Sequence, residues 1–250
     1  MKITSLNNDL IKETAKLLQK KYRDESGLFL IEGEKGVKEA QEFNISLEKI
    51  FWSGKFPDYI LDKSLLIEVN EAVLGKISDA KTPPPIVAIA KQPNFKFEDL
   101  KSMNKVVLLE NIKDSGNLGT IIRTSVAFGV DAIILYGETV DLYNPKTVRS
   151  TVGNLWKTKI YSIKDFDILQ EYFKNFERLA TLPKSDDTQY LGSYQINKPA
   201  LIMFGSESSG LSENLKSFAT QNITIEMKKN VESLNLAISA GIILYKLFVK

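Results

Sequence analysis

The sequence contains no cysteine and no histidine. The absence of cysteine excludes a disulfide framework, a Cys-ligated zinc site, an iron–sulfur cluster and a thiolate nucleophile. The absence of histidine excludes a Ser-His-Asp triad and acid–base catalysis by imidazole. Any chemistry must therefore use Lys, Arg, Asp, Glu, Ser, Thr, Tyr, Asn or backbone groups, and we expect no metal site.

Long apolar runs and a strong net charge are also missing. No stretch of 18 apolar residues occurs and the N-terminus has no signal-peptide core, so we expect a cytoplasmic protein without a membrane span. The net charge of +2 neither demands nor excludes a nucleic-acid partner. The 250 residues are 43% apolar and 26% charged, a balance that excludes wholesale disorder.

Basic residues are concentrated near the N-terminus. The first 23 residues carry six cations against two acids, Asp9 and Glu13. Apolar residues at helical spacing predict a helix over 8–23, capped by Asn7 or Asn8. Its basic face is either an ordinary solvated surface or a surface that contacts phosphates. The candidate side chains are those of Lys12, Lys16, Lys20, Lys21 and Arg23.

The first part of the chain alternates short apolar strands with short helices, which predicts a small α/β layer domain. The expected strands are 27–33, 47–54, 65–69 and 85–91, and the expected helices are 34–43 and 70–80. The segment 91–104 is polar and lacks a clear period, so we place the linker there. The predicted domains are 1–98 and 99–250.

The second part has strands that are almost continuously apolar, as in a parallel sheet buried on both faces. They are 105–110, 131–136, 158–163, 178–182, 200–204 and 223–227. Helices are expected at 118–128, 165–175, 212–219 and 233–248. The last of these is apolar nearly all round, which predicts burial in a core or an interface and favours a dimer.

Polar loops follow three of these strands, and ligands of open α/β sheets bind beyond the carboxyl ends of strands. The first loop, 114–119, contains two glycines and precedes a helix whose free N–H groups could face a phosphate. Arg123 lies in the second turn of that helix. The pattern is neither a dinucleotide fingerprint nor a P-loop, and an ordinary helix start remains the alternative.

The other two loops carry a carboxylate and an amide. Glu207 follows the strand that ends at Gly205, where it could pair with Arg123, and Ser212 could cap the next helix. Asn235 lies at the start of the last helix, where its amide could orient a ligand. The alternative there is a simple cap from Asn230 to Ser233.

Three segments together resemble motifs one, two and three of the SpoU (TrmH) family of RNA ribose 2′-O-methyltransferases, in the SPOUT superfamily. They are "NLGTIIRTSVAFG" (117–129), "MFGSESSGLS" (203–212) and "IEMKKNVESLNLAISAGIILY" (225–245). The serines of the second segment depart from the family pattern, and "RSTVGNLW" (149–156) matches only loosely. The segments 5–40 and 83–90 resemble the ribosomal-protein-like substrate-binding domain that often precedes the catalytic domain.

The resemblance implies an α/β fold with a trefoil-knotted C-terminal methyltransferase domain and a smaller N-terminal RNA-binding α/β domain. It also implies S-adenosylmethionine (AdoMet) as cofactor and a homodimer formed through the methyltransferase domain. By the same resemblance, the catalytic pocket comprises Asn117, Arg123, Glu207, Ser233 and Asn235. The cofactor-binding residues are Gly205, Ile225, Ser233, Leu234 and Asn235.

The family likeness assigns Arg123 to activation of the ribose hydroxyl, but a guanidinium stays protonated in proteins. We therefore expect Arg123 to bind a phosphate and to stabilise negative charge on O2′, with Glu207 and Asn117 positioning it. Only RNA has the 2′-hydroxyl that is attacked. The preferred substrate is rRNA; the alternatives are a tRNA methyltransferase and a non-enzymatic RNA-binding module with a decayed catalytic domain.

Overall fold

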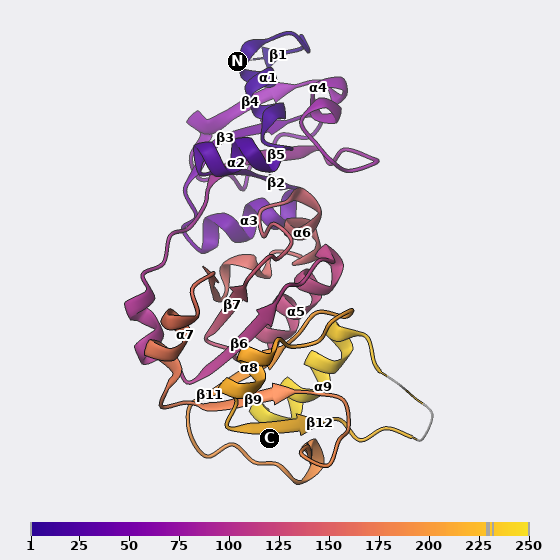
Figure 1. Cartoon of the computed structure of the whole chain (residues 1–250). Helices are drawn as coiled ribbons and strands as arrows, with labels where there is room; N and C mark the ends of the chain where they lie inside the picture. The colour runs from indigo at the N-terminus through magenta and orange to yellow at the C-terminus, as the bar shows by residue number, and fades with distance from the viewer. Residues whose placement is uncertain (1, 229–230, 232, 250) are drawn as a thin grey trace. The chain divides into compact units, whose positions relative to one another are not determined.

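The computed structural model describes residues 2–228, 231 and 233–249. The chain forms two compact units, whose helices and strands are labelled in Figure 1. The first comprises Met1–Asn94 and Asp141–Lys157, and the second Phe95–Val140 and Thr158–Lys250. The domain boundary at residue 98 stays a prediction, and no pattern in the sequence indicates that the segment 141–157 packs with the first unit.

The sheet of the first unit has the strand order β1-β4-β3-β5-β2. Strand β5 is antiparallel to β2 and β3, whereas β4 is parallel to β1 and β3. The strands are β1 (Lys2–Ile3), β2 (Leu28–Glu32), β3 (Leu47–Trp52), β4 (Leu66–Val69) and β5 (Ile86–Lys91). The helices are α1 (Asp9–Lys16), α2 (Lys20–Ser26), α3 (Glu34–Glu42) and α4 (Glu71–Lys76), with a 3-10 turn η1 at Lys63–Leu65.

The helix expected over 8–23 is interrupted. It ends as α1 at Lys16 and restarts as α2 at Lys20, with the cap residue Gln19 in an extended conformation. Asn8 caps α1 by accepting the N–H of Leu10 at 3.0 Å. The break frees the carbonyl of Leu17, and the Arg23 guanidinium donates to that oxygen at 2.7 Å. A side chain six positions further along therefore satisfies the group that a continuous helix would have paired.

The segment 141–157 packs against β2. It contains α6 (Pro145–Ser150) and a 3-10 turn η3 (Asn154–Trp156). The ring of the fully buried Phe29 lies 4.8 Å from that of Tyr143 and 5.6 Å from that of Trp156, measured between centroids. Such ring pairs contribute about 0.5–1.5 kcal/mol each beyond the area they bury, so this aromatic cluster helps to hold the segment on the first unit.

The sheet of the second unit has the order β10-β12-β9-β11-β6-β7-β8. Every pairing found within it is parallel, which confirms the prediction from the apolar runs. Its strands are β6 (Lys105–Glu110), β7 (Ala132–Tyr136), β8 (Lys159–Ile163), β9 (Glu177–Thr181), β10 (Gln189–Tyr190), β11 (Ala200–Phe204) and β12 (Gln221–Thr224).

Helices accompany this sheet at the predicted places. They are α5 (Ser115–Ala127), α7 (Phe166–Phe173), α8 (Glu213–Phe218) and α9 (Leu236–Phe248), with 3-10 turns η2 (Phe97–Ser102) and η4 (Leu191–Ser193). Helices α5 and α9 pack against each other (Figure 1). Helix α5 begins three residues earlier than expected and α9 three later, at Leu236. None of the helices in the described ranges is long and apolar enough to cross a membrane.

Candidate active site

Side chains from three distant segments meet at the carboxyl end of the parallel sheet. Asn117 lies in the first turn of α5, Glu207 follows β11, and Asn235 precedes α9. The side-chain amide of Asn117 donates to Glu207 Oε1. The amide of Asn235 donates to Asn117 Oδ1 at 3.1 Å. Motifs that the sequence separates by 90 and 118 positions therefore form one hydrogen-bonded chain.

Capping hydrogen bonds at the N-termini of α5 and α9 hold Asn117 and Asn235 in place. Asp114 caps α5 by accepting the N–H of Asn117 at 2.7 Å. Asn235 caps α9, since its Oδ1 accepts the N–H of Ala237 at 2.9 Å and that of Ile238 at 3.3 Å. Asn235 therefore lies before the helix rather than inside its start. Its remaining amide hydrogens are free to reach Asn117.

The loop after β11 is tightly folded on itself. A Cβ placed on Gly205 would lie 2.0 Å from the carbonyl carbon of Gly210 and 2.2 Å from Leu211 N. Ser206 and Gly210 form an isolated β-bridge, and the hydroxyls of Ser206 and Ser209 are 2.7 Å apart. Only glycine fits at position 205, and the resulting turn projects Glu207 toward Asn117.

Arg123 is exposed on α5 and stands apart from this hydrogen-bonded chain. It lies six positions after Asn117, which places it about 120° around the helix and about 9 Å along the axis. Within the described ranges it makes no hydrogen bond or ion pair that would fix it. The expected positioning of Arg123 by Asn117 and Glu207 is therefore not present, because Glu207 bonds Asn117 instead.

The remaining predicted cofactor residues flank the same end of the sheet. Ile225 directly follows β12 and is half-buried, as is Leu234, whereas Ser233 is exposed. The cap suggested at Asn230 lies outside the described residues. The described part of the chain holds no group of three or more carboxylates arranged to bind a metal ion.

Glu110 is a residue of this region that the sequence analysis missed. It ends β6, is 3% exposed, and its Oε2 accepts the backbone N–H of Ser212 at 2.7 Å. Burial, reinforced by the carboxylates of Glu110 and Asp165, raises the pKa of the adjacent Tyr136. One feature of the sequence could have indicated this role: Glu110 is an acidic residue at the end of an otherwise apolar strand. A carboxylate buried at such a place needs a hydrogen-bond partner.

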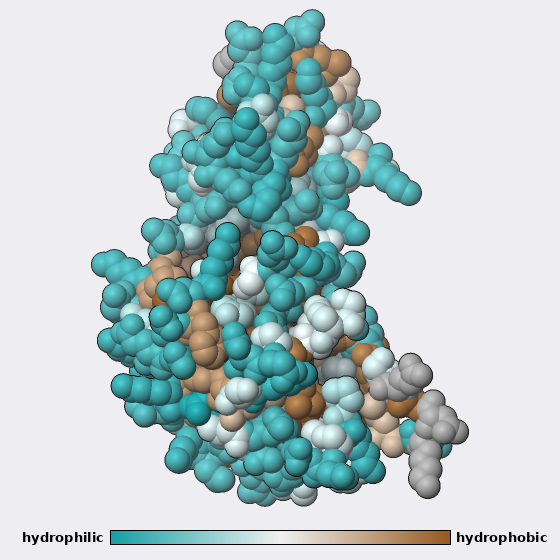
Figure 2. Space-filling model, viewed as in Figure 1, coloured by the Kyte–Doolittle hydropathy of each residue, from teal (hydrophilic) through white to brown (hydrophobic). Residues whose placement is uncertain are grey.

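The candidate RNA-binding lysines lie on the surface of α1 and α2, a mostly hydrophilic region in Figure 2. Each has an acidic neighbour one turn away. The pairs are Lys12–Asp9 at 3.4 Å, Lys16–Glu13 at 2.7 Å, Lys20–Asp24 at 2.5 Å and Lys21–Glu25 at 3.9 Å. Asp24 and Glu25 offset much of the positive charge that the first 23 residues carry.

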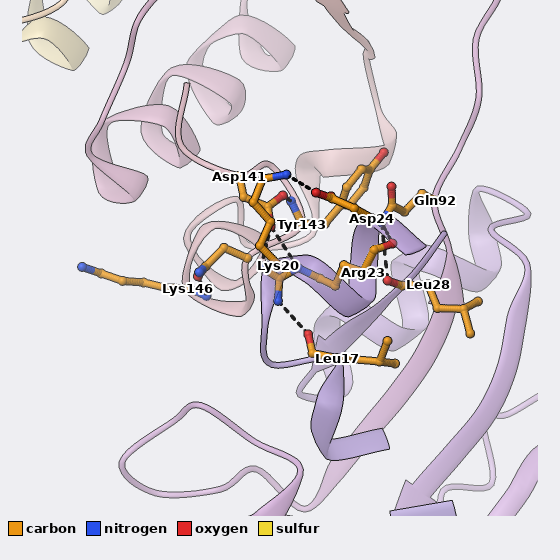
Figure 3. A network of polar contacts seen from close by, with 10 residues as sticks. Leu17, Lys20, Arg23, Asp24, Leu28, Gln92, Asp141, Tyr143 and Lys146 are labelled. Carbon is orange, nitrogen blue, oxygen red and sulfur yellow. Dashed lines mark hydrogen bonds and ion pairs between the residues drawn. The ribbon is translucent and has the colours of Figure 1, made fainter. Parts of the chain in front are cut away.

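Arg23 is buried, whereas the sequence predicts it on the RNA-binding surface; its assignment to RNA contacts is therefore corrected. Its side chain is 2% exposed and pairs with Asp141, whose Oδ2 accepts from Nε at 2.9 Å and from Nη2 at 2.5 Å (Figure 3). Asp141 Oδ1 accepts the N–H of Tyr143 at 2.9 Å. Buried in this network, the guanidinium holds the segment 141–157 and is not available to a phosphate.

Comparison with known proteins identifies the family of both halves of the chain. Residues 104–245 match the SpoU rRNA Methylase family, and residues 8–88 match the MRM3-like substrate binding domain. The chain is 32% identical to an uncharacterized tRNA/rRNA methyltransferase of Synechocystis, over 98% of this chain and 92% of that protein. It is 30% identical to the 23S rRNA (guanosine(2553)-2'-O)-methyltransferase RlmP of Bacillus subtilis, over 98% of each chain.

A solved structure agrees with these sequence relatives. The AdoMet-bound rRNA methyltransferase of Sinorhizobium meliloti superposes with a TM-score of 0.89 at 30% identity, covering 98% of this chain and 96% of that one. The protein described here belongs to the SpoU rRNA methylase family, and the resemblance drawn from its three motifs is confirmed.

Proposed function

We propose that this protein transfers a methyl group from AdoMet to a ribose 2′-hydroxyl of rRNA. The observation that carries the proposal is the junction of Asn117, Glu207 and Asn235, because it unites the three motif loops at the carboxyl end of the sheet. The kinship with RlmP supports rRNA as the substrate. An rRNA substrate also suggests a cytoplasmic site of action.

The residues at this junction fit AdoMet by their chemistry. The amides of Asn117 and Asn235, the carboxylate of Glu207 and the backbone after β11 and β12 provide both donors and acceptors. Such groups match the amino, hydroxyl and carboxylate groups of this ligand. When bound, AdoMet supplies the methyl group on a sulfonium. We assign Gly205, Ile225, Ser233, Leu234 and Asn235 to holding it.

The chain's own part in the reaction is alignment and charge stabilisation. Arg123 is exposed and unpaired among the described residues, so its guanidinium is available to an RNA phosphate. There it stabilises negative charge on O2′, while the proton leaves to a phosphate oxygen or to water. Asn117, Glu207, Ser233 and Asn235 complete the pocket, with Asn117 linking its two sides.

The lysines of α1 and α2 are our candidates for phosphate contacts away from the pocket: Lys12, Lys16, Lys20 and Lys21. Their ion pairs are exposed, and such pairs contribute only about 0–1 kcal/mol each. A phosphate can therefore replace the acidic neighbour at little cost. The match to a substrate-binding domain over residues 8–88 supports this assignment.

The trefoil knot is proposed for the second unit. Support comes from the strand order, in which the late strand β12 lies between β9 and β10, and β11 lies between β9 and β6. Family membership, shown by the match over residues 104–245, points the same way.

A transfer assay tests the proposed function. Purified protein is incubated with methyl-labelled AdoMet and either rRNA or tRNA, and the RNA is digested to nucleosides. We expect label in a 2′-O-methylnucleoside from rRNA only. Label from tRNA alone would change the substrate, whereas AdoMet binding without transfer to any RNA would contradict the assignment as an enzyme.

The homodimer is proposed to form through α9. Ile238, Ile242 and Tyr245 are 55%, 39% and 61% exposed, and their spacing of four and three residues puts them on one face of the helix. A continuous apolar stripe of this kind marks an interaction surface. A second copy of α9 offers the same stripe, as a two-fold interface requires.

Replacing Ile242 with glutamate should shift the protein from dimer to monomer, because a carboxylate would be buried in an apolar interface. Light scattering coupled to size-exclusion chromatography measures the mass. The control is Gln195→Glu, which adds the same charge at an exposed position outside α9. An unchanged mass for the Ile242 variant would place the interface elsewhere.

A further inference from the structure

Glu110 is a buried carboxylate to which neither the motifs nor the family likeness assigns a role. It ends β6, which lies between β11 and β7 in the sheet, and it is 3% exposed. Burying an ionised group is costly unless hydrogen bonds compensate. The bond from Ser212 N to Glu110 Oε2, at 2.7 Å, supplies such a compensating hydrogen bond.

That bond fixes the far end of the loop that carries Glu207. Ser212 is where the loop enters α8, and its Oγ accepts the N–H of Leu215 at 3.5 Å. The preceding Leu211 is 2% exposed and so is packed in the core. At the near end, Gly205 is pressed against Gly210 with no room for a side chain. The loop 205–212 is thus held at both ends.

We propose that Glu110 is a positioning residue that anchors the loop 205–212 in the shape needed to bind AdoMet and to present Glu207 to Asn117. This inference rests on the proposed function, and it explains how the loop 205–212, which we assign to AdoMet binding, is held in place. The described contact of the carboxylate is with a backbone N–H of the loop, and not with Asn117 or Glu207. Its task is therefore to accept one hydrogen bond at a fixed distance.

If Glu110 only accepts this hydrogen bond, substitutions at position 110 should differ in how well they preserve AdoMet binding. Glutamine has the same length and keeps a carbonyl oxygen that can accept the Ser212 N–H. Aspartate keeps the charge but is shorter by one methylene, so it cannot reach. If Glu110 instead exchanged a proton during the reaction, aspartate would be the better replacement and glutamine the worse one.

The experiment measures AdoMet affinity by isothermal titration calorimetry for Glu110→Gln, Glu110→Asp and Glu110→Ala. We expect the Gln variant to bind within about threefold of the unaltered protein, and the Asp and Ala variants to bind at least about tenfold more weakly. Hydrogen exchange of the Ser212 amide should quicken in the Asp and Ala variants only. Glu213→Gln, which removes an exposed carboxylate next to Ser212, is the control.

The opposite order, with Asp retaining affinity and Gln losing it, would overturn the proposal, as would normal affinity and exchange in Glu110→Ala. If Ala or Asp prevents folding, the Gln variant still decides, because its loss of AdoMet binding contradicts a positioning role. The exchange measurement needs neither cofactor nor RNA. It therefore tests the anchor even if the unaltered protein fails to bind AdoMet or to methylate RNA.

Discussion

Replacing Arg123 with alanine should lower the rate of methyl transfer to rRNA by about 10²–10³-fold, the usual cost of losing one electrostatic stabiliser of a transition state. AdoMet affinity should stay within about twofold, because no hydrogen bond among the described residues links Arg123 to the Asn117–Glu207–Asn235 chain. Single-turnover transfer measures the rate and calorimetry the affinity. The physical reason is the loss of the guanidinium that we propose stabilises negative charge on O2′.

Two further variants sharpen this result. Arg123→Lys keeps the charge but loses the planar pair of donors, so we expect partial recovery of the rate. Lys216→Ala removes an exposed cation from α8 in the same unit and should leave the rate unchanged. Full turnover by the alanine variant would exclude the role given to Arg123.

Replacing Asp141 with alanine should destabilise the protein by about 3–5 kcal/mol, because the buried charge of Arg23 would lose its anionic partner. The guanidinium cannot lose its proton to relieve that cost. Its remaining acceptor in the network is the Leu17 carbonyl, at 2.7 Å. Urea unfolding followed by tryptophan fluorescence measures the change, and Trp156 in the segment 141–157 reports on the site.

The exposed pair Lys2–Glu68 provides the matched control for this prediction. Its side chains are 60% and 40% exposed, so Glu68→Ala should cost no more than about 1 kcal/mol. The double variant Arg23→Met, Asp141→Leu should be more stable than Asp141→Ala alone, since it removes both charges. Equal stability of the Asp141 variant and the unaltered protein would mean that the buried pair contributes nothing.

The distribution of apolar residues along the sequence is enough to predict most of the strands and helices. Continuous apolar runs located β6, β7, β8 and β11 and predicted their parallel pairing, because burial on both faces leaves a signature within each strand. The break between α1 and α2 left no such signature. It depends on Arg23 reaching back to the Leu17 carbonyl, a contact that helical periodicity does not encode.

The site was predicted unevenly for a similar reason. Motif residues such as Asn117, Glu207 and Asn235 could be named from the family likeness, and they meet in the structure. Their partners could not be named, since which group bonds which depends on loop shape. For Arg23 the prediction is wrong: its place in a basic helix predicts a surface cation, but Asp141, 118 positions away, pairs with it in the structure.

The course of the segment 141–157 has a consequence for how such proteins diversify. The chain leaves β7, covers Phe29 with Tyr143 and Trp156, and returns as β8, so the first unit is built from two separate stretches of the gene. If recombination replaced only the N-terminal stretch with that of a relative, the new β2 would have to pack against the original Tyr143 and Trp156. A functional exchange of the first unit would therefore have to move both stretches, 1–94 and 141–157, together.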